Sequence, residues 1–298
     1  MSSTRGAGTR SGFIALAGRP NVGKSTLANA IVGAKVAIVS DKPQTTRRAI
    51  RGVASGPDWQ LVLVDLPGVQ RPRDALTARM QRRVEQELED ADGCLFVINA
   101  QEGVGPGDRF IARLLEPAQI PVLIAVNKID RADRAGAAAA LQAAEELDVA
   151  DEIFPVSALT GSGMRSLVDH LVSLLPEGPF YFEPRQHTDQ PERVRLAELV
   201  REQVLLRTRQ EVPHSIEVVI EAIEPGDPVR IEAVLLAETE SQKRILVGAG
   251  GQMVKSIGTA ARHAIERELG ARVHLDLRVR VRRHWRADEH LLDRLGIE

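Results

Sequence analysis

A glycine-rich segment between an apolar run and a helix-like run constrains this chain more than any other feature. Residues Gly18–Ser25 read GRPNVGKS and fit the phosphate-loop pattern G-x-x-x-x-G-K-S/T. The run Phe13–Ala17 before it suits a strand, and Thr26–Val32 after it has helical spacing. The glycines let backbone N–H groups surround an anion, and the helix N-terminus adds a favourable dipole. The segment predicts a nucleotide site in which Lys24 reaches the outer phosphates and the Ser25 hydroxyl binds magnesium.

Composition narrows the classes of protein. The 298 residues are enough for two domains, and the formal net charge of −2 means that any nucleic-acid contact must come from a local basic surface. The single cysteine, Cys94, excludes an internal disulfide and a cysteine metal cluster and favours a reducing compartment. No apolar stretch approaches the roughly 20 residues that span a bilayer. We expect a cytoplasmic monomer whose residues 1–11 form a disordered tail, not a secretion signal.

Strand-like and helix-like segments alternate over residues 12–176. This alternation predicts an α/β domain with a mostly parallel sheet, helices on both faces, and ligands at the carboxyl ends of the strands. The predicted strands are Phe13–Ala17, Ala49–Ala54, Gln60–Val64, Cys94–Asn99, Val122–Val126 and Ile153–Val156, and the predicted helices are Lys24–Val32, Asp74–Ala91, Gly107–Leu115, Arg131–Leu147 and Met164–Leu175.

A change in composition marks a second domain. Residues 177–191 contain prolines and polar residues and are predicted to be a linker, so the second domain covers residues 192–298. We expect an α+β domain in which a glycine loop separates two helices before the last strand. Its predicted elements are a helix at Glu192–Arg209, strands at Ser215–Ala222 and Val229–Glu238, the helix pair, and a strand at Arg272–Arg283 with period-two alternation.

Two further motifs at strand ends identify the nucleotide as GTP. In the D-x-x-G tetrapeptide, Asp65 can hold a magnesium-bound water and the Gly68 amide can bond the terminal phosphate. In Asn-Lys-Ile-Asp, the Asp130 carboxylate can accept both N1–H and the exocyclic amine of guanine, a donor pair that adenine lacks. A site built on such hydrogen bonds rejects an analogue without them by about 10⁴-fold. Asn127 braces that loop and Lys128 packs along the base.

Ser157-Ala158 ends the last strand of the first domain, where a backbone amide can donate to guanine O6. The predicted GTP-binding residues are Gly18, Arg19, Pro20, Asn21, Val22, Gly23, Lys24, Ser25, Thr26, Asp65, Leu66, Pro67, Gly68, Asn127, Lys128, Asp130, Ser157 and Ala158.

Together these motifs resemble those of translation-factor-type GTPases over nearly the whole first domain. The resemblance implies that a threonine in a loop before the aspartate strand closes on magnesium. Thr46 is the favoured residue and Thr45 its rival, and a loop or helix-cap role is the alternative. The implied magnesium ligands are Ser25, Thr46 and Asp65.

Hydrolysis is expected to proceed by direct attack of water, with Lys24, Asn21 and Thr46 as the catalytic residues. Ras-like enzymes place a glutamine after the D-x-x-G glycine, and this chain has Val69 there, so turnover should be slow, on the order of 10⁻⁴ to 10⁻² per second. In potassium-dependent relatives an asparagine matching Asn21 helps to bind a monovalent cation. Asn21 either does the same here or only stabilises the loop.

The G-x-x-G loop Gly248–Gly251 lies between the two predicted helices of the second domain. This order resembles a type II KH domain, whose glycine loop closely approaches a nucleic-acid backbone. Aromatic residues are only 3% of the chain, so an aliphatic groove is expected to replace base stacking, unless its residues only pack in the core. Neither of the residues between the glycines, Ala249 and Gly250, is basic, so phosphate contact is expected to depend on backbone amides and on nearby basic residues. The predicted RNA-binding residues are Lys243, Arg244, Gly248, Ala249, Gly250, Gly251, Lys255 and Arg262. The predicted groove includes Ile245, Val254 and Ile257.

Three arginines alternate along the last predicted strand, at Arg278, Arg280 and Arg282. Such a pattern is typical of a solvated strand face, and an RNA-facing patch is the alternative.

A GTPase domain followed by a type II KH domain resembles the Era family of bacterial ribosome-assembly GTPases, over about residues 12–285. The matching segments read GRPNVGKST, QTTR, DLPG, NKID and SQKRILVG. The resemblance implies a GTP-hydrolysing switch whose KH domain binds the 3′ end of small-subunit ribosomal RNA and assists 30S maturation. It also implies Mg²⁺ as cofactor and a place at the inner face of the cell membrane.

Two rival functions belong to other classes of protein. The first is a membrane-associated signalling GTPase whose second domain binds protein, and Gly248 and Gly251 argue against it. The second is an RNA-binding module with a merely structural nucleotide site. The intact set of Lys24, Ser25, Asp65 and Asn127 argues against that one.

Overall fold

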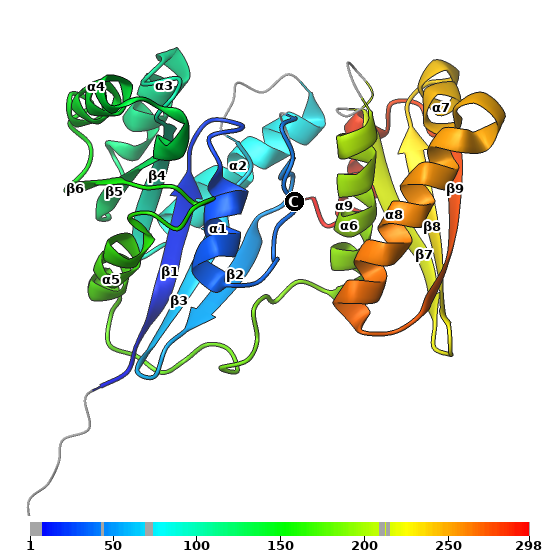
Figure 1. Ribbon diagram of the computed structural model, residues 1–298, viewed down its shortest axis with the longest axis horizontal. Coiled ribbons are helices and arrows are strands. Elements are labelled where there is room, and N and C mark those ends of the chain that lie inside the picture. Colours follow the sequence, from blue (N-terminus) through cyan, green and yellow to red (C-terminus); the bar gives the residue numbers. More distant parts are fainter. Residues whose placement is uncertain (1–7, 43–44, 69–73, 209–211, 213–214, 298) are drawn as a thin grey trace, which may run out of the picture. The chain divides into compact units, whose positions relative to one another are not determined.

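The computed structural model describes residues 8–42, 45–68, 74–208, 212 and 215–297 (Figure 1). The chain divides into two compact units. The first consists of Met1–Ala37, Thr46–Pro72 and Arg79–Asp189. The second contains Gln190–Glu298 together with two short segments from earlier in the chain, Ile38–Thr45 and Arg73–Ala78.

A mixed sheet with one antiparallel edge forms the centre of the first unit. Its order in the described residues is β2-β3-β1-β4-β5-β6; β2 is antiparallel to β3, and every other pair is parallel. The prediction of a mostly parallel sheet is therefore confirmed. The strands are β1 (Arg10–Ala17), β2 (Ile50–Ser55), β3 (Trp59–Asp65), β4 (Gly93–Asn99), β5 (Val122–Asn127) and β6 (Glu152–Pro155).

Helices cover both faces of this sheet. On one face, α1 (Lys24–Val32) and α5 (Met164–Leu174) bury leucines against β1 and β3. On the other, α2 (Ala75–Glu89), α3 (Pro106–Leu115) and α4 (Arg134–Glu145) pack against β4 and β5. All of β4 is buried, including Cys94, because a central parallel strand is covered on both sides.

The structure moves several predicted boundaries. β1 begins at Arg10, inside the predicted tail, and the Thr9 side chain bonds the Gly178 carbonyl at 2.8 Å. The helix predicted from Arg131 begins at Arg134, because a 3₁₀ turn at Ile129–Arg131 precedes it and Asp133 caps it by accepting from the Gly136 amide. The helix predicted over 74–91 ends at Glu89. The cap at Asp133, which helical periodicity does not report, decides where α4 begins.

The predicted linker at 177–191 is bonded along much of its length to the first unit. The Gln60 side chain accepts from the amides of Tyr181 and Phe182 at 2.8 and 2.9 Å and donates to the Phe182 carbonyl. The Val53 amide donates to the His187 carbonyl at 2.8 Å. This segment is therefore anchored at several points.

The second unit is built around a three-stranded sheet in the order β7-β8-β9. β7 and β8 are antiparallel, whereas β8 and β9 are parallel, so a helical crossover joins them. Two long helices, labelled α6 and α8 in Figure 1, pack against this sheet. Their buried residues form one core with those of the strands. The elements are α6 (Glu192–Arg207), β7 (Ile216–Glu224), β8 (Val229–Ala237), α7 (Glu240–Val247), a 3₁₀ turn at Ala249–Gly251, α8 (Gln252–Leu269) and β9 (Val273–Val281).

A short C-terminal helix was not predicted. α9 (Glu289–Arg294) follows a 3₁₀ turn at Trp285–Ala287 and is capped by Asp288, which accepts from the Leu291 amide at 3.0 Å. Trp285 is fully buried, and its indole N–H donates to the Ser215 carbonyl at 2.9 Å. Tertiary burial holds this segment in place.

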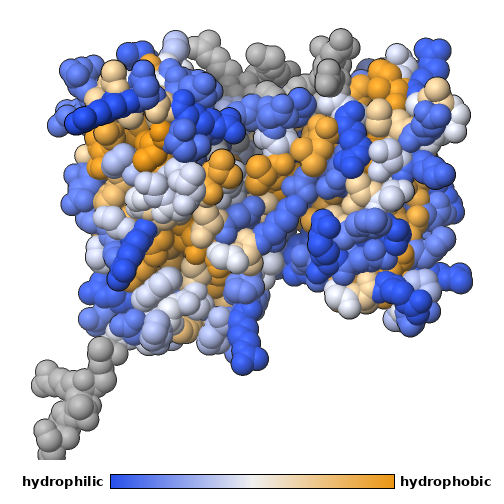
Figure 2. Space-filling view, viewed as in Figure 1, coloured by the Kyte–Doolittle hydropathy of each residue, from blue (hydrophilic) through white to orange (hydrophobic). Residues whose placement is uncertain are grey.

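Hydrophilic side chains cover most of the viewed face of each unit, and apolar side chains gather in patches among them (Figure 2). Among the described residues, none of the helices has the length and apolar character that a membrane crossing requires.

Candidate functional site

The phosphate loop joins β1 to α1 and depends on two glycines. At Gly18, with φ 151°, a Cβ would lie 2.7 Å from the Val97 carbonyl oxygen. At Gly23, with φ 102°, it would lie 2.4 Å from Asn127 Nδ2. Side chains are excluded at both positions, so the loop lies directly against the carboxyl ends of the neighbouring strands. Pro20 and Thr26 belong to the same loop–helix junction.

Lys24 begins α1 and is buried. Its Nζ donates to the carbonyls of Gly18 at 2.9 Å and Arg19 at 3.1 Å. Burial lowers the pKa of Lys24 to about 8, although the neighbouring Asp65 opposes the shift. The two carbonyls thus hold an ammonium group within the phosphate loop.

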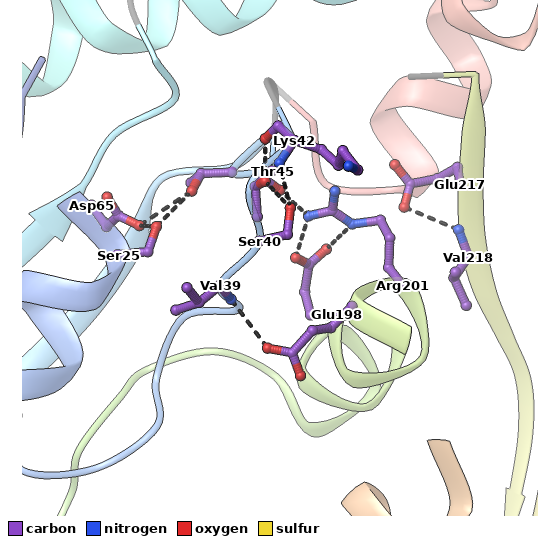
Figure 3. A network of polar contacts seen from close by, with 12 residues as sticks. Ser25, Val39, Ser40, Lys42, Thr45, Asp65, Glu198, Arg201, Glu217 and Val218 are labelled. Atoms are coloured by element: carbon purple, nitrogen blue, oxygen red, sulfur yellow. Dashed lines mark hydrogen bonds and ion pairs between the residues drawn. The ribbon is translucent and has the colours of Figure 1, made fainter. Parts of the chain in front are cut away.

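The side chains of Ser25 and Asp65 meet near the phosphate loop (Figure 3), and the Thr46 hydroxyl joins them. The Ser25 hydroxyl donates to Asp65 Oδ2 at 2.6 Å, the Thr46 hydroxyl donates to the same atom at 3.2 Å, and the two hydroxyls are 3.0 Å apart. Burial raises the pKa of Asp65, and its Oδ1 is buried with no hydrogen-bond partner among the described residues. A hard cation such as Mg²⁺ prefers oxygen ligands, and this set fits it.

The rival threonine faces a different set of partners. The Thr45 hydroxyl donates to the Lys42 carbonyl at 2.6 Å and is 2.7 Å from Ser40 Oγ. Of the two threonines, the structure brings only Thr46 to Ser25 and Asp65.

The D-x-x-G segment follows β3 and approaches the phosphate loop. A Cβ at Gly68 would lie 2.8 Å from Pro20 Cγ and 2.9 Å from Pro20 N, so the two loops are in close contact. Leu66 is buried beneath them, next to Pro67. Val69 lies outside the described residues.

Asn127 ends β5 and connects three loops. Its Nδ2 donates to the Val22 carbonyl at 3.0 Å, and its Oδ1 accepts from the Ala158 amide at 3.1 Å. Of the Ser157-Ala158 segment, in which a backbone amide was predicted to bond guanine O6, the Ala158 amide has its partner in Asn127. This geometry matches the bracing role predicted for Asn127.

The rest of the guanine motif surrounds this asparagine. Lys128 Nζ donates to the Asn21 carbonyl at 2.5 Å, and both residues adopt φ 65°. Partial burial lowers the pKa of Lys128, and the nearby Glu102 opposes that shift. The exposed Asp130 accepts from the Ser157 hydroxyl at 2.6 Å, which orients one carboxylate oxygen.

The glycine loop of the second unit lies between α7 and α8. Gly248, Gly250 and Gly251 have φ of 72°, 56° and 79°, and a Cβ at Gly248 would lie 2.6 Å from Met253 Cβ. No atom lies within 4 Å of the Cβ positions of Gly250 and Gly251. The loop therefore exposes left-handed backbone that a side chain would strain. Of the predicted basic residues near it, Arg244 and Lys255 are exposed, and Lys243 and Arg262 are partly exposed.

A shallow groove of about 260 Å³ adjoins α8 and β9. Its composition differs from the predicted groove: Ile257 is fully buried in the core, and Ile245 is exposed but does not line the groove. The helix face that carries Ile257 turns toward the sheet, so only Val254 of the predicted trio lines the groove. The lining residues are Val254, Lys255, Gly258, Thr259, Arg262, Leu275 and Leu277.

Each of the three alternating arginines, two in β9 and Arg282 just after its end, has an acidic partner. Arg278 pairs with Asp276, Arg280 with Glu221 at 2.5 Å, and Arg282 with Asp288. This pairing favours the solvated strand face over the RNA-facing patch.

Comparisons with known proteins agree with both halves of this description. Residues 13–128 match the family described as 50S ribosome-binding GTPase, and residues 211–286 match the KH domain family. GTPase Era of Mycobacterium tuberculosis is 47% identical over 96% of this chain and 98% of its own length. The chain belongs to the Era family of GTPases. It is accordingly an enzyme that hydrolyses GTP.

Solved Era structures share the fold over almost the full length. Era of Aquifex aeolicus, as a variant bound to GDP and tetrafluoroaluminate, is 37% identical with a TM-score of 0.92 over 97% of this chain and 99% of its own. Era in complex with MgGDPNP and nucleotides 1506–1542 of 16S ribosomal RNA is 38% identical with a TM-score of 0.93 over the same shares. The predicted fold of a phosphate-loop GTPase domain followed by a KH domain is confirmed.

Sequence reasoning missed several residues of this Era-family chain that contact the predicted loops. In the second unit, Arg201 donates to the Thr45 carbonyl and pairs with Glu198, while the Val39 amide donates to Glu202 Oε1 at 3.1 Å (Figure 3). In the first unit, Asp108 and Glu102 flank Arg19. The acidic residues follow no motif, and charged residues inside a buried helix contradict the usual amphipathic pattern.

Proposed function

We propose that this protein binds the 3′ region of small-subunit ribosomal RNA through its second unit and that GTP controls this binding during 30S subunit maturation. The observation that carries the proposal is the exposed, left-handed backbone at Gly250 and Gly251. Such a loop can approach a phosphodiester backbone that any Cβ would keep at a distance. The Era complex with a 16S ribosomal RNA fragment supports the same assignment.

The groove beside this loop suits single-stranded RNA. Leu275, Leu277 and Val254 offer an aliphatic surface for bases, and Lys255 and Arg262 supply positive charge for phosphates. Arg262 already pairs with Glu266 at 2.8 Å, so its charge is partly neutralised. We therefore propose that backbone amides and Lys255 provide most of the phosphate contacts, with a modest dependence on salt.

For hydrolysis we propose that Ser25, Thr46 and Asp65 hold Mg²⁺, which neutralises charge on the transferred phosphoryl group. Lys24, held by two carbonyls, meets the outer phosphates, and Asn21 contributes to a potassium site near them. The attacking water reacts directly, and positioning supplies the rate enhancement.

The nucleotide would act on RNA binding through the two loops that Thr46 and Asp65–Asp74 define. The segment Ile38–Thr45, which ends next to Thr46, is bonded to α6 through Arg201 at Thr45 and Glu202 at Val39. In the same unit, Arg286 Nε donates to Asp74 Oδ2 at 2.8 Å. Movement of Thr46 onto magnesium would therefore pull on a peptide that the RNA-binding unit holds, and the linkage would act in both directions.

Filter binding tests the proposal with full-length protein and RNA of the 16S 3′ end, in GTP and in GDP. Gly251→Asp places a strained, charged side chain at the loop and should weaken binding by at least tenfold. Gly270→Asp is the matched control, because Gly270 also has a positive φ and open space but lies at the other end of α8. Unaltered RNA binding by Gly251→Asp would rule out the loop, and equal affinity in GTP and GDP would rule out the switch.

We further propose that the protein acts as a cytoplasmic monomer and meets the inner face of the cell membrane only peripherally. The family resemblance supports this placement. Sedimentation of the purified protein, alone and with anionic vesicles, tests it.

A further inference from the structure

The side chain of Arg19, the second residue of the phosphate loop, is enclosed by the loop between β4 and α3. Its Nε lies 2.7 Å from Asp108 Oδ2, its Nη1 lies 3.2 Å from Glu102 Oε2, and its Nη2 donates to the Gly103 carbonyl at 3.3 Å. The Asp108 side chain is fully buried, whereas that of Glu102 is half exposed. An unpaired buried carboxylate is costly, so Arg19 stabilises Asp108 at this position.

Both carboxylates are themselves held in place. Asp108 Oδ2 accepts from the Gly105 amide at 2.8 Å, at the N-terminus of α3. Glu102 Oε1 accepts from Asn99 Nδ2 at 2.7 Å, at the end of β4. The partners of Arg19 are therefore parts of a rigid frame.

Gly107 makes room for this arrangement. A Cβ at Gly107 would lie 2.5 Å from Arg19 Cδ and 3.0 Å from Arg19 Cγ. These are inner atoms of the side chain, so they cannot move aside without shifting the guanidinium group. We call Arg19, Glu102, Gly107 and Asp108 the arginine clamp.

The same residue also contacts the lysine of the site, through its backbone. The Arg19 carbonyl accepts from Lys24 Nζ at 3.1 Å, next to the Gly18 carbonyl at 2.9 Å. We propose that Arg19 is a positioning residue for GTP: the arginine clamp fixes its carbonyl, and the carbonyl orients the Lys24 ammonium toward the phosphates. The clamp goes beyond the phosphate-loop motif, because three of its four members lie outside that motif.

The clamp also adjoins the guanine side of the site. Burial lowers the pKa of Lys128, Glu102 opposes that shift and Arg19 adds to it, so both clamp charges act on the lysine that donates to the Asn21 carbonyl. Release of Glu102 from Arg19 would therefore change the electrostatic potential at Lys128 as well as at Arg19.

Binding and turnover measurements on the full chain test the clamp. Arg19→Ala removes the paired group, and Gly107→Ala displaces it while keeping every charge. Each should weaken GTP and GDP binding by about tenfold or more, the loss expected when one charge-assisted contact is misplaced, and should lower kcat. Arg19→Lys should recover part of the loss, because a lysine can still pair with Asp108. The control is Arg109→Ala, an exposed arginine next to Asp108, which should behave as wild type.

A double-mutant cycle separates positioning from general stability. If Arg19 acts through Lys24, then Arg19→Ala should weaken GDP binding far less in a Lys24→Ala background than in the wild type. Circular dichroism sets a temperature at which every variant is folded. If Arg19→Ala does not fold, Glu102→Gln replaces it in the test, because it changes only the half-exposed partner of Arg19. Additive effects in the cycle, or normal affinity with only a lowered Tm, would overturn the proposal.

Discussion

Asn127 Nδ2 donates to the Val22 carbonyl at 3.0 Å and so joins the guanine-reading loop to the phosphate loop. The contact is buried, and the absence of a side chain at Gly23 is what allows it. One asparagine thereby fixes the distance between the two ends of the nucleotide site.

Replacement of Asn127 by alanine should separate these ends. The change removes two hydrogen bonds and leaves the buried Val22 carbonyl without this donor, at a cost of about 1–3 kcal/mol for the orphaned group. GTP affinity should fall roughly 10- to 100-fold by the same arithmetic. Titration with a fluorescent GTP analogue measures this loss, with Gln142→Ala on α4 as control. Wild-type affinity in Asn127→Ala would contradict the bracing role.

Asp130 should determine which base is accepted. Its carboxylate is oriented by Ser157 and offers two acceptors to guanine. Asp130→Asn should therefore prefer xanthosine triphosphate to GTP, with a loss of GTP selectivity on the order of 10⁴-fold. Competition hydrolysis with both nucleotides measures the ratio. Asp133→Asn, three residues on and at a helix cap where asparagine is equally suitable, should leave it unchanged. Continued guanine preference in Asp130→Asn would refute the assignment.

Potassium should accelerate turnover. Asn21 is exposed, has φ 65° and lies in the phosphate loop, so its side chain can add an oxygen ligand near the phosphates. We expect turnover at least several-fold faster in potassium than in sodium, on the scale by which an added charge stabilises the transition state, and expect Asn21→Ala to lose the difference. Phosphate release at matched ionic strength measures it, and equal rates in the two salts would dispose of the idea.

The native thiol should be inert. Burial raises the pKa of Cys94 to about 12 from a usual 9.0, so about one molecule in ten thousand carries the thiolate at pH 8. Alkylation by iodoacetamide should occur only after denaturation, as read by mass spectrometry. Because the folded pKa is raised, this group leaves stability unchanged below pH 9 and reduces it as the pH rises from about 9 toward 12. Rapid modification of the native protein at pH 8 would contradict this burial.

The predicted core of the nucleotide site depended on local signals, which is why sequence could describe it. An apolar run, a glycine loop and a helix in series dictate their own geometry, and Lys24, Ser25 and Asp65 converge because parallel strands end at one edge. Thr46 could not be separated from Thr45 in this way, because neighbours in a loop differ only in what each happens to face.

Features that depend on tertiary partners escaped prediction. Residues 196–205 of α6 are all buried, so the charged residues Glu198 and Arg201 among them carry no periodic signal, and the Thr45 carbonyl that Arg201 contacts lies far away in sequence. Asp108 reads as an ordinary first-turn acid until Arg19 is placed beside it. α9 is too short for its pattern to be significant, and the burial of Leu291 and Leu292 stabilises it.

Cys94 lies in β4, which helices cover on both faces of the sheet, and this burial has a practical use. Thiol-reactive dyes would label only cysteines introduced on the surface of the native protein, without removal of the native residue. Pairs of such labels, one on each unit, would report by energy transfer how the spacing between the units changes through a cycle of nucleotide exchange.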